Sequence, residues 1–278
     1  MCACNERRRV AARAANREER SDTSIMSLCN EQQRVACALG GIYTALSVDG
    51  VLPVLHCGPG CIVSISSMLS VANGGQNAVK FMESSLPCTN FCDADVVFGG
   101  MDKLHTLIER SLEYYDAELF LVVSGCASEI IGDDMEEAVG RFADVGKPVI
   151  HAELPGFKGD NLYGHGKVLN ALIDRCAAPC PGRKNPLLVN VLGIVPHYDP
   201  MWAATLDKLE AMLERIGLKP NILYGRNGGL DKFAAIPSAG FNLVVSPWVD
   251  LDVAELLKDR FGAPYLHYPN IPIGPTEE

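Results

Sequence analysis

The stretch Glu118–Ser124, Glu-Leu-Phe-Leu-Val-Val-Ser, followed by Gly125-Cys126, decides the fold class of this chain. Its apolar residues occupy consecutive positions, whereas a strand with one solvated face alternates apolar and polar residues. The run is therefore typical of a strand buried on both faces in a parallel sheet. Gly125 marks the carboxyl end of this strand, which is the edge where parallel sheets carry their ligand sites.

Strand-like runs alternate with helical patterns on both sides of this stretch. We expect further strands at Val51–His56, Asp95–Phe98 and Pro148–His151, with helices at residues 61–70, 101–114 and 128–144. A second series follows, with strands at 187–195, 220–224, 241–245 and 264–268 and helices at 201–216, 228–235 and 251–262. This alternation predicts an α/β fold built from βαβ units on parallel sheets.

Three prolines between Cys176 and Pro186 interrupt the two series and predict a linker, because proline cannot continue a helix. We therefore expect a disordered tail over residues 1–28 and a first α/β domain over 29–183. A second, smaller Rossmann-like domain is expected over 184–278.

Charge and composition exclude several classes of protein. The net charge is −10, and residues 1–20 carry six Arg against three Glu, so the rest of the chain carries −13. An acidic body argues against a nucleic-acid partner. No apolar run approaches the roughly 20 residues that span a bilayer, which argues against a membrane partner. The 11 cysteines, odd in number and without a signal-peptide core, predict a reduced, cytoplasmic chain with metal-binding thiolates.

Three cysteines occupy positions that suit a metal cluster. Cys61 ends a Gly-Pro-Gly turn after the strand at Val51–His56, and Cys126 follows the strand at Glu118–Ser124. Both thiols are expected at one sheet edge, and Cys37 precedes Ala-Leu-Gly-Gly. Soft thiolates on one edge favour iron–sulfur ligation. The backbone at Gly58, Gly60 and Gly125 is expected to approach the cluster closely and to donate N–H groups to it.

A zinc site is the alternative that the spacing allows. Cys57 and Cys61 form one pair, and Cys88 and Cys92 form another with the same three-residue spacing. Four thiolates would complete a tetrahedral site and stabilise an interaction module. However, the usual spacing is two intervening residues, and the second pair lies in a loop without a zinc-ribbon hairpin.

Four motifs, taken in order, carry a resemblance to a known family. They are His56-Cys-Gly-Pro-Gly-Cys61, Asp95-Val-Val-Phe-Gly-Gly100, Gly125-Cys126 with Glu129-Ile-Ile-Gly-Asp-Asp134, and Gly156-Phe-Lys-Gly159. Together they resemble the nitrogenase component 1 family, over roughly residues 29–276. That family comprises the alpha and beta subunits of the molybdenum–iron protein, their scaffold paralogues and nitrogenase-like reductases.

The resemblance implies consecutive Rossmann-like domains, of which two are present here where the family has three. It implies that Cys37, Cys61 and Cys126 bind the cluster as in alpha-type subunits, while Cys29 matches the first ligand of beta-type subunits. The implied cofactor is [4Fe-4S] or a P-cluster-like [8Fe-7S] cluster. Implied partners are a second copy or a paralogous subunit, together with an ATP-dependent iron-protein reductase.

Two further positions bear on the reaction. His165 matches the histidine that hydrogen-bonds the active-site cofactor in alpha subunits, so a catalytic role is implied for it. Ser246 stands where the family has its cofactor-ligating cysteine, and the family's third domain is not expected here. We therefore expect an oxidoreductase subunit that relays low-potential electrons to a bound acceptor. A non-catalytic scaffold for cofactor assembly is the alternative that Ser246 favours.

A paired catalytic acid and base is one interpretation of four acidic residues, Asp133, Asp134, Glu136 and Glu137. They follow Gly132 at the expected start of a helix, where carboxylates complement the helix dipole. We therefore expect them to play a structural role.

Overall fold

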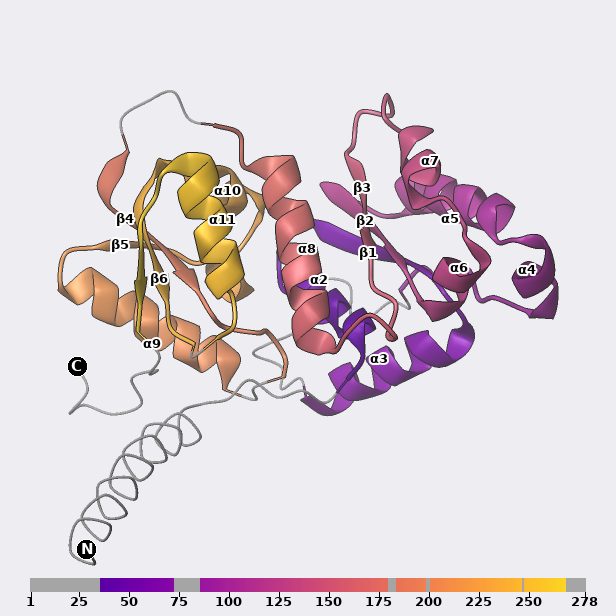
Figure 1. The fold of residues 1–278 in the computed structure, drawn as a ribbon, viewed down its shortest axis with the longest axis horizontal. Helices are drawn as coiled ribbons and strands as arrows, with labels where there is room; N and C mark the ends of the chain where they lie inside the picture. The colour runs from indigo at the N-terminus through magenta and orange to yellow at the C-terminus, as the bar shows by residue number, and fades with distance from the viewer. Residues whose placement is uncertain (1–35, 73–85, 180–183, 199–200, 247, 269–278) are drawn as a thin grey trace, which may run out of the picture.

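The computed structural model describes residues 36–72, 86–179, 184–198, 201–246 and 248–268. Two parallel sheets organise them (Figure 1). The first sheet has the order β1-β2-β3 and consists of β1 (Val51–His56), β2 (Leu119–Ser124) and β3 (Val149–Glu153). The second has the order β5-β4-β6-β7 and consists of β4 (Asn185–Leu192), β5 (Lys219–Asn221), β6 (Ala239–Val244) and β7 (Tyr265–His267).

Helices connect and cover these strands. Those around the first sheet are the 3-10 helix η1 (Ala38–Gly41), α2 (Ile42–Leu46), α3 (Pro59–Ala72), α4 (Asp93–Phe98), α5 (Met101–Tyr114), α6 (Cys126–Ile131), α7 (Met135–Gly140) and α8 (Asn161–Cys176). Those around the second are α9 (Trp202–Arg215), η2 (Gly225–Asn227), α10 (Leu230–Ala235), η3 (Ile236–Ser238) and α11 (Leu251–Phe261). Within the described residues, no helix has the length and apolar character needed to cross a membrane.

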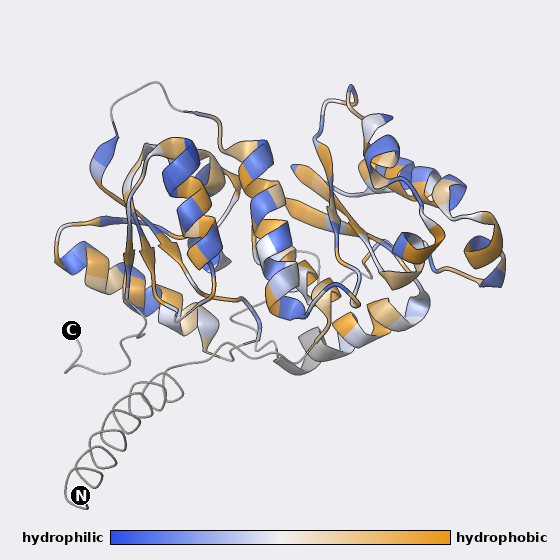
Figure 2. Cartoon of the chain, in the orientation of Figure 1, coloured by the Kyte–Doolittle hydropathy of each residue, from blue (hydrophilic) through white to orange (hydrophobic). Residues whose placement is uncertain are grey.

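The predicted α/β class with parallel strands is confirmed. Every residue of β1 and β2 is buried, as the unbroken apolar run at Glu118–Ser124 predicted. Figure 2 shows the strands of the first sheet as largely apolar ribbons and the helices as a mixture of polar and apolar residues. The expected domain boundaries stay a prediction, and the expected tail lies outside the described residues.

The predicted strand at Asp95–Phe98 is wrong, because these residues form most of α4. Asp95 accepts a hydrogen bond from the Cys92 backbone N–H at 2.7 Å and pairs with the Lys103 ammonium at 2.6 Å. This capping box starts a helix and overrides the strand preference of the valines. As a result Val97 and Phe98 are exposed, Phe98 by 85%.

Two further differences from the sequence patterns concern helices. The helix expected over 128–144 is two short helices, α6 and α7, because Gly132 takes a positive φ of 78° between them and ends α6. The patterns also gave no helix over 161–176, where the structure has α8. Asp160 starts α8 by accepting the backbone N–H groups of Leu162 and Tyr163 at 3.0 and 3.1 Å.

Helix α8 stands between the two sheets (Figure 1) and packs closely against η1 and α2. A Cβ atom on Gly164 would lie 1.8 Å from the Ala38 carbonyl oxygen, and one on Gly41 would lie 2.4 Å from the Gly164 oxygen. Only glycine allows the backbones to approach this closely. The crossing therefore fixes the segment that begins at Cys37 against α8.

Three buried asparagines join the strands of the second sheet. Asn221 donates to the Asn190 side-chain oxygen at 2.8 Å, and Asn190 donates to that of Asn242 at 2.7 Å. Asn190 also donates to the Ile236 carbonyl at 3.2 Å. The ladder is therefore satisfied inside the protein, where an unpaired amide is costly.

Replacing the central asparagine should destabilise the protein strongly. In Asn190→Ala, the partner groups of Asn221 and Asn242 lose their bonds while staying buried, so we expect the free energy of unfolding to fall by about 3 kcal/mol. Urea denaturation measures this loss. The control is Asn227→Ala at an exposed side chain, which should change stability by less than about 0.5 kcal/mol. Equal effects of the two substitutions would contradict this account.

Candidate functional site

Two of the predicted cluster cysteines follow strands that end at the same level. His56 pairs with Ser124 in the register of β1 and β2, so both loops leave one edge of the first sheet. Cys61 lies in the first turn of α3, and Cys126 is the first residue of α6. The common sheet edge that the sequence predicted for them is therefore present.

The loop between β3 and α8 holds Cys37 near this edge through backbone hydrogen bonds. The Ala38 N–H donates to the Gly159 carbonyl at 3.0 Å, and the Asn161 N–H donates to the Ala36 carbonyl at 2.9 Å. These bonds hold the residue between them beside the loop, although it is far from that loop in sequence. Lys158 anchors the loop in turn, through ion pairs with Glu129 at 3.0 Å and Glu153 at 3.1 Å.

The thiols of Cys37 and Cys126 converge on Gly156. A Cβ atom at this position would lie 3.3 Å from the Cys37 sulfur and 3.4 Å from the Cys126 sulfur. The Gly156 N–H donates to the Cys126 sulfur at 3.0 Å. Both cysteines are exposed. The sulfurs of Cys37 and Cys126 are therefore two exposed soft donors on either side of a glycine. We call this arrangement the Gly156 cradle.

Gly156 lies in one of the motifs that carry the family resemblance, but the sequence alone indicates no role for it at the site. The signal was the Gly-Phe-Lys-Gly stretch, which follows the strand next to β2. Only the fold shows that this stretch faces the residue after β2.

Cys61 does not join Cys37 and Cys126 in a group that could hold a metal ion among the described residues. Its thiol shares a hydrogen bond with Cys57, and the Cys57 sulfur lies 3.8 Å from the Cys88 sulfur. The bond from Cys57 lowers the pKa of Cys61 to about 6, against the opposing effect of burial. The bond with Cys57, helped by the Asn90 N–H, lowers the pKa of Cys88 to about 7. These interactions and burial raise the pKa of Cys57, and either sulfur of the Cys57–Cys88 contact can be the donor.

The zinc hypothesis requires Cys92 to join these three residues. Instead, the Cys92 sulfur is exposed and lies 3.8 Å from the Lys103 ammonium. Across the described parts of the chain, no group of three or more His, Cys, Asp or Glu residues is arranged to hold a metal ion. Cys29, the alternative first ligand, lies outside the described residues.

The three glycines predicted to approach a cluster differ in their surroundings. Built Cβ atoms on Gly58 and Gly60 would meet nothing within 4 Å, so the structure leaves open space there. A Cβ on Gly125 would lie 2.7 Å from that of Cys57, and its N–H already donates to the His56 carbonyl and the Ser128 hydroxyl. Their contact with a cluster stays a prediction.

Below this edge, the buried His56 ring lies 2.9 Å from an Asp133 carboxylate oxygen. The same carboxylate accepts the Gly100 N–H at 3.0 Å. Burial lowers the pKa of His56, although Asp133 opposes this effect. Asp133 thus ties the end of β1 to the turn before α5, while Asp134 caps α7 by accepting the Glu137 N–H at 2.9 Å. These acidic residues therefore play the structural role that we expected, although Asp133 does so by contacting His56 and Gly100 and not by complementing a helix dipole.

The family model for nitrogenase component 1 type oxidoreductases matches residues 36–277, which is most of the chain. The chain belongs to this family. Among curated relatives, it is 26% identical to the nitrogenase molybdenum-iron protein alpha chain of Methanothermobacter marburgensis over 258 residues, covering 88% of this chain and 53% of that protein. It is 24% identical to the nitrogenase iron-molybdenum cofactor biosynthesis protein NifE of a Nostoc species, covering 86% and 49%.

A solved structure described as nitrogenase Cp1 at pH 5 superposes with a TM-score of 0.68 at 21% identity, covering 86% of this chain and 50% of the other. That likeness supports the Rossmann-like α/β fold. This member of the nitrogenase component 1 family therefore spans about half the length of the curated relatives that it matches.

His165 and Ser246, the positions that the resemblance connected with a second cofactor, are both engaged inside the chain. His165 is 1% exposed, with Nδ1 2.8 Å from the Thr44 hydroxyl and Nε2 3.1 Å from an Asp250 carboxylate oxygen. The Ser246 hydroxyl accepts the Val249 N–H at 3.1 Å. A catalytic contact of His165 stays a prediction, and its geometry in this structure is that of a link between α2 and the start of α11.

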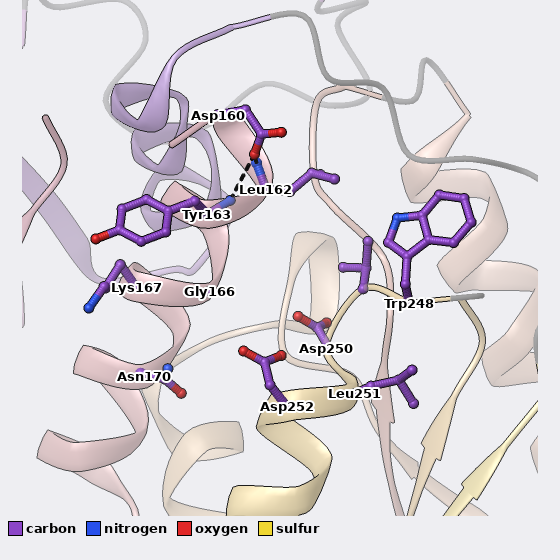
Figure 3. Close-up of a pocket in the computed structure, with 11 residues that line it drawn as sticks. Asp160, Leu162, Tyr163, Gly166, Lys167, Asn170, Trp248, Asp250, Leu251 and Asp252 are labelled. Atoms are coloured by element: carbon purple, nitrogen blue, oxygen red, sulfur yellow. Dashed lines mark hydrogen bonds between the residues drawn. The ribbon is translucent and has the colours of Figure 1, made fainter. Parts of the chain in front are cut away.

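A cavity of about 560 Å³ opens beside this link, between α8 and the start of α11 (Figure 3). Its polar lining includes Lys167 and Asn170 on α8 and the carboxylates of Asp250 and Asp252. None of its lining residues is a cysteine or a histidine. The cavity offers oxygen and ammonium groups, so it does not share the soft-donor chemistry of the cysteine edge.

A third buried histidine, His197, lies where the chain leaves β4. His197 has a positive φ of 68°, and neither ring nitrogen has a hydrogen-bond partner among the described residues. Its ring packs 6.0 Å from that of Tyr43 and 4.9 Å from that of Trp202. Burial lowers the pKa of His197 to about 4, because the charged ring would lose its hydration.

This shift predicts the direction of a pH effect. The unfolded chain binds a proton on His197 below about pH 6.5, whereas the folded chain does so only near pH 4, so stability is lost as the pH falls between these values. We expect His197 to account for about 2 kcal/mol of the loss between pH 7 and pH 5. Urea denaturation of His197→Asn at both pH values should show a loss smaller by that amount. Asn does not titrate and tolerates the positive φ. An unchanged pH dependence would contradict the assignment.

Proposed function

We propose that this chain binds an iron–sulfur cluster through Cys37, Cys61 and Cys126 and relays low-potential electrons from an ATP-dependent iron-protein reductase to a bound acceptor. The observation that carries the proposal is the convergence of two exposed thiols, Cys37 and Cys126, on the Gly156 cradle. Exposed thiols beside a glycine leave room for a bulky inorganic group, whereas cysteines that only pack in the core are buried.

The donor set fits such a cluster chemically. Thiolates are the ligands that iron–sulfur clusters take, and an N–H directed at a ligand sulfur tunes the reduction potential. The Gly156 N–H has that direction toward Cys126. When bound, the cluster supplies one-electron transfer. For Cys61 to ligate it, this thiol exchanges its bond with Cys57 for the metal.

A second protein chain is part of the proposal. Three cysteines leave a four-iron cluster one ligand short, and three from each of two chains suit an eight-iron cluster. We propose a second copy or a paralogous subunit facing Cys37 and Cys126. The family includes alpha and beta chains among the relatives of this protein. The expected contact surface includes residues near Val63, whose side chain is 63% exposed.

Exposed apolar residues on α4 support a protein partner as well. Val96, Val97 and Phe98 are all exposed on one short helix next to the cysteine edge. Exposed apolar groups of this size mark protein contact sites when they gather on one surface.

A scaffold that holds a cluster precursor is the second candidate, and Ser246 favours it. This position follows β6 with a hydroxyl that is buried and already hydrogen-bonded, so it offers no soft ligand to a second cofactor. Relatives of this chain include proteins named for cofactor biosynthesis. A turnover assay with a reductase component separates the candidates: sustained electron transfer supports the oxidoreductase, while cluster transfer to an acceptor protein without turnover supports the scaffold.

Cluster binding is tested by iron and sulfide analysis after anaerobic preparation. The protein should be brown, and Cys126→Ala should lose most of its iron, because one of the two exposed donors is gone. Cys176→Ala is the matched control, since this half-buried cysteine lies at the end of α8, and it should keep its iron. Stoichiometric zinc without iron, or equal iron loss in both variants, would overturn the proposal.

The cradle itself is tested by adding one methyl group. In Gly156→Ala, the new Cβ would lie 2.8 Å from the Cys37 Cβ and close to both sulfurs, so the thiols must separate. We expect iron affinity to fall by about tenfold or more. Gly166→Ala is the control, because a Cβ there would meet nothing within 4 Å. Competition with a coloured iron chelator measures both variants. Unchanged affinity in Gly156→Ala would place the cluster elsewhere.

A further inference from the structure

Two cysteines outside the proposed ligand set lie side by side at the first sheet. Cys57 directly follows β1, and Cys88 comes from a segment that runs along the end of this strand. The Leu55 N–H donates to the Pro87 carbonyl at 2.8 Å, and the Thr89 N–H donates to the Leu55 carbonyl at 3.0 Å. Backbone bonds on both sides of Cys88 therefore fix its distance from the strand.

The side chains complete this arrangement. The two sulfurs lie 3.8 Å apart, and the Asn90 N–H donates to the Cys88 sulfur at 3.4 Å. A disulfide needs an S–S distance of about 2 Å, which side-chain rotation can supply when the backbones are already adjacent. Cys57 is 1% exposed, whereas Cys88 is half-buried. An oxidant in solution therefore reaches Cys88 first.

We propose that Cys57 and Cys88 are a redox-active pair that closes to a reversible intramolecular disulfide in the presence of a low-molecular-weight disulfide of the glutathione class. The Cys88 thiolate attacks one sulfur of the small disulfide, whose S–S bond breaks and releases one small thiol. The Cys57 sulfur then attacks the Cys88 sulfur and releases the second small thiol. The two protein thiols lose two electrons, and their protons leave on the two small thiols.

The disulfide does not depend on the proposed cluster, because it forms between two thiols that lie outside the proposed ligand set.

Cys61 and Cys92 are the competing partners. Cys61 is held in the first turn of α3 by the bond from its N–H to the Gly58 carbonyl at 3.2 Å, and Cys92 lies beside Lys103. Trypsin separates the possibilities, because cleavage after Arg34, Lys80 and Lys103 places Cys57 in peptide 35–80, together with Cys37 and Cys61, and places Cys88 and Cys92 in peptide 81–103. A link between the two peptides in which Cys37 and Cys61 are recovered alkylated assigns the bond to Cys57.

The experiment treats the reduced full-length chain, freed of metal with a chelator, with oxidised glutathione. It then quenches with acid, alkylates the remaining thiols and maps the digest by mass spectrometry. We expect peptides 35–80 and 81–103 to be linked at an oxidant concentration about tenfold below that which glutathionylates Cys176, because the pair is already adjacent. Dithiothreitol should reverse the link. Cys92→Ser should leave it intact, and Cys61→Ser should leave it intact as well.

Cys88→Ser tests the assignment directly. It should abolish the link while circular dichroism shows an unchanged fold, and Cys57 should then be recovered alkylated. The proposal is overturned if Cys57 and Cys88 are both alkylated after the other exposed thiols have reacted with glutathione. It is overturned equally if the link survives in Cys88→Ser or is lost in Cys92→Ser. Iron binding plays no part in these readouts, so they separate this proposal from the cluster proposal.

Discussion

The close crossing of Gly164 on α8 with Ala38 and Gly41 is the contact on which the rest of the arrangement depends. It brings two backbones together at a distance that no side chain allows. On one side, it holds the segment around Cys37 against the loop before α8. On the other, it places His165 between Thr44 and Asp250. A single helix thus positions a thiol at the first sheet and a buried histidine–carboxylate contact at the start of α11.

The parts of the fold that the sequence predicted are those fixed by burial. The runs at Val51–His56 and Glu118–Ser124 are apolar on both faces, and only a covered parallel strand satisfies that pattern. Asp95–Phe98 failed because its valines suggested a strand, while the capping interactions of Asp95 decided for a helix. Helix α8 was missed because its glycines, which weaken a helical pattern, serve the crossing with η1.

Part of the candidate site could likewise be predicted from the sequence, and part could not. That Cys61 and Cys126 leave one sheet edge follows from strand order, which the sequence indicates. The convergence of Cys37 and Cys126 on Gly156 depends on contacts between distant segments, and no local pattern records such contacts. The interaction of Cys61 is with a neighbouring thiol, Cys57, and the spacing of the cysteines does not indicate this contact. Spacing predicted which loops meet, and side-chain partners decide where each sulfur points.

The two sheets differ in the chemistry that their carboxyl edges present, and this difference locates the proposed function. At the first sheet, sulfur atoms occupy the loops after β1 and β2, and glycine leaves them room. At the second, the loop after β6 is closed by internal bonds: Ser246 accepts the Val249 N–H, and Asp250 accepts the Gly193 N–H at 2.7 Å. A cofactor at that edge would have to break these bonds without gaining a soft ligand. The metal chemistry proposed for this chain therefore belongs to the first sheet, where the glycine crossing of α8 with η1 and the backbone bonds beside Cys37 hold this residue at the edge.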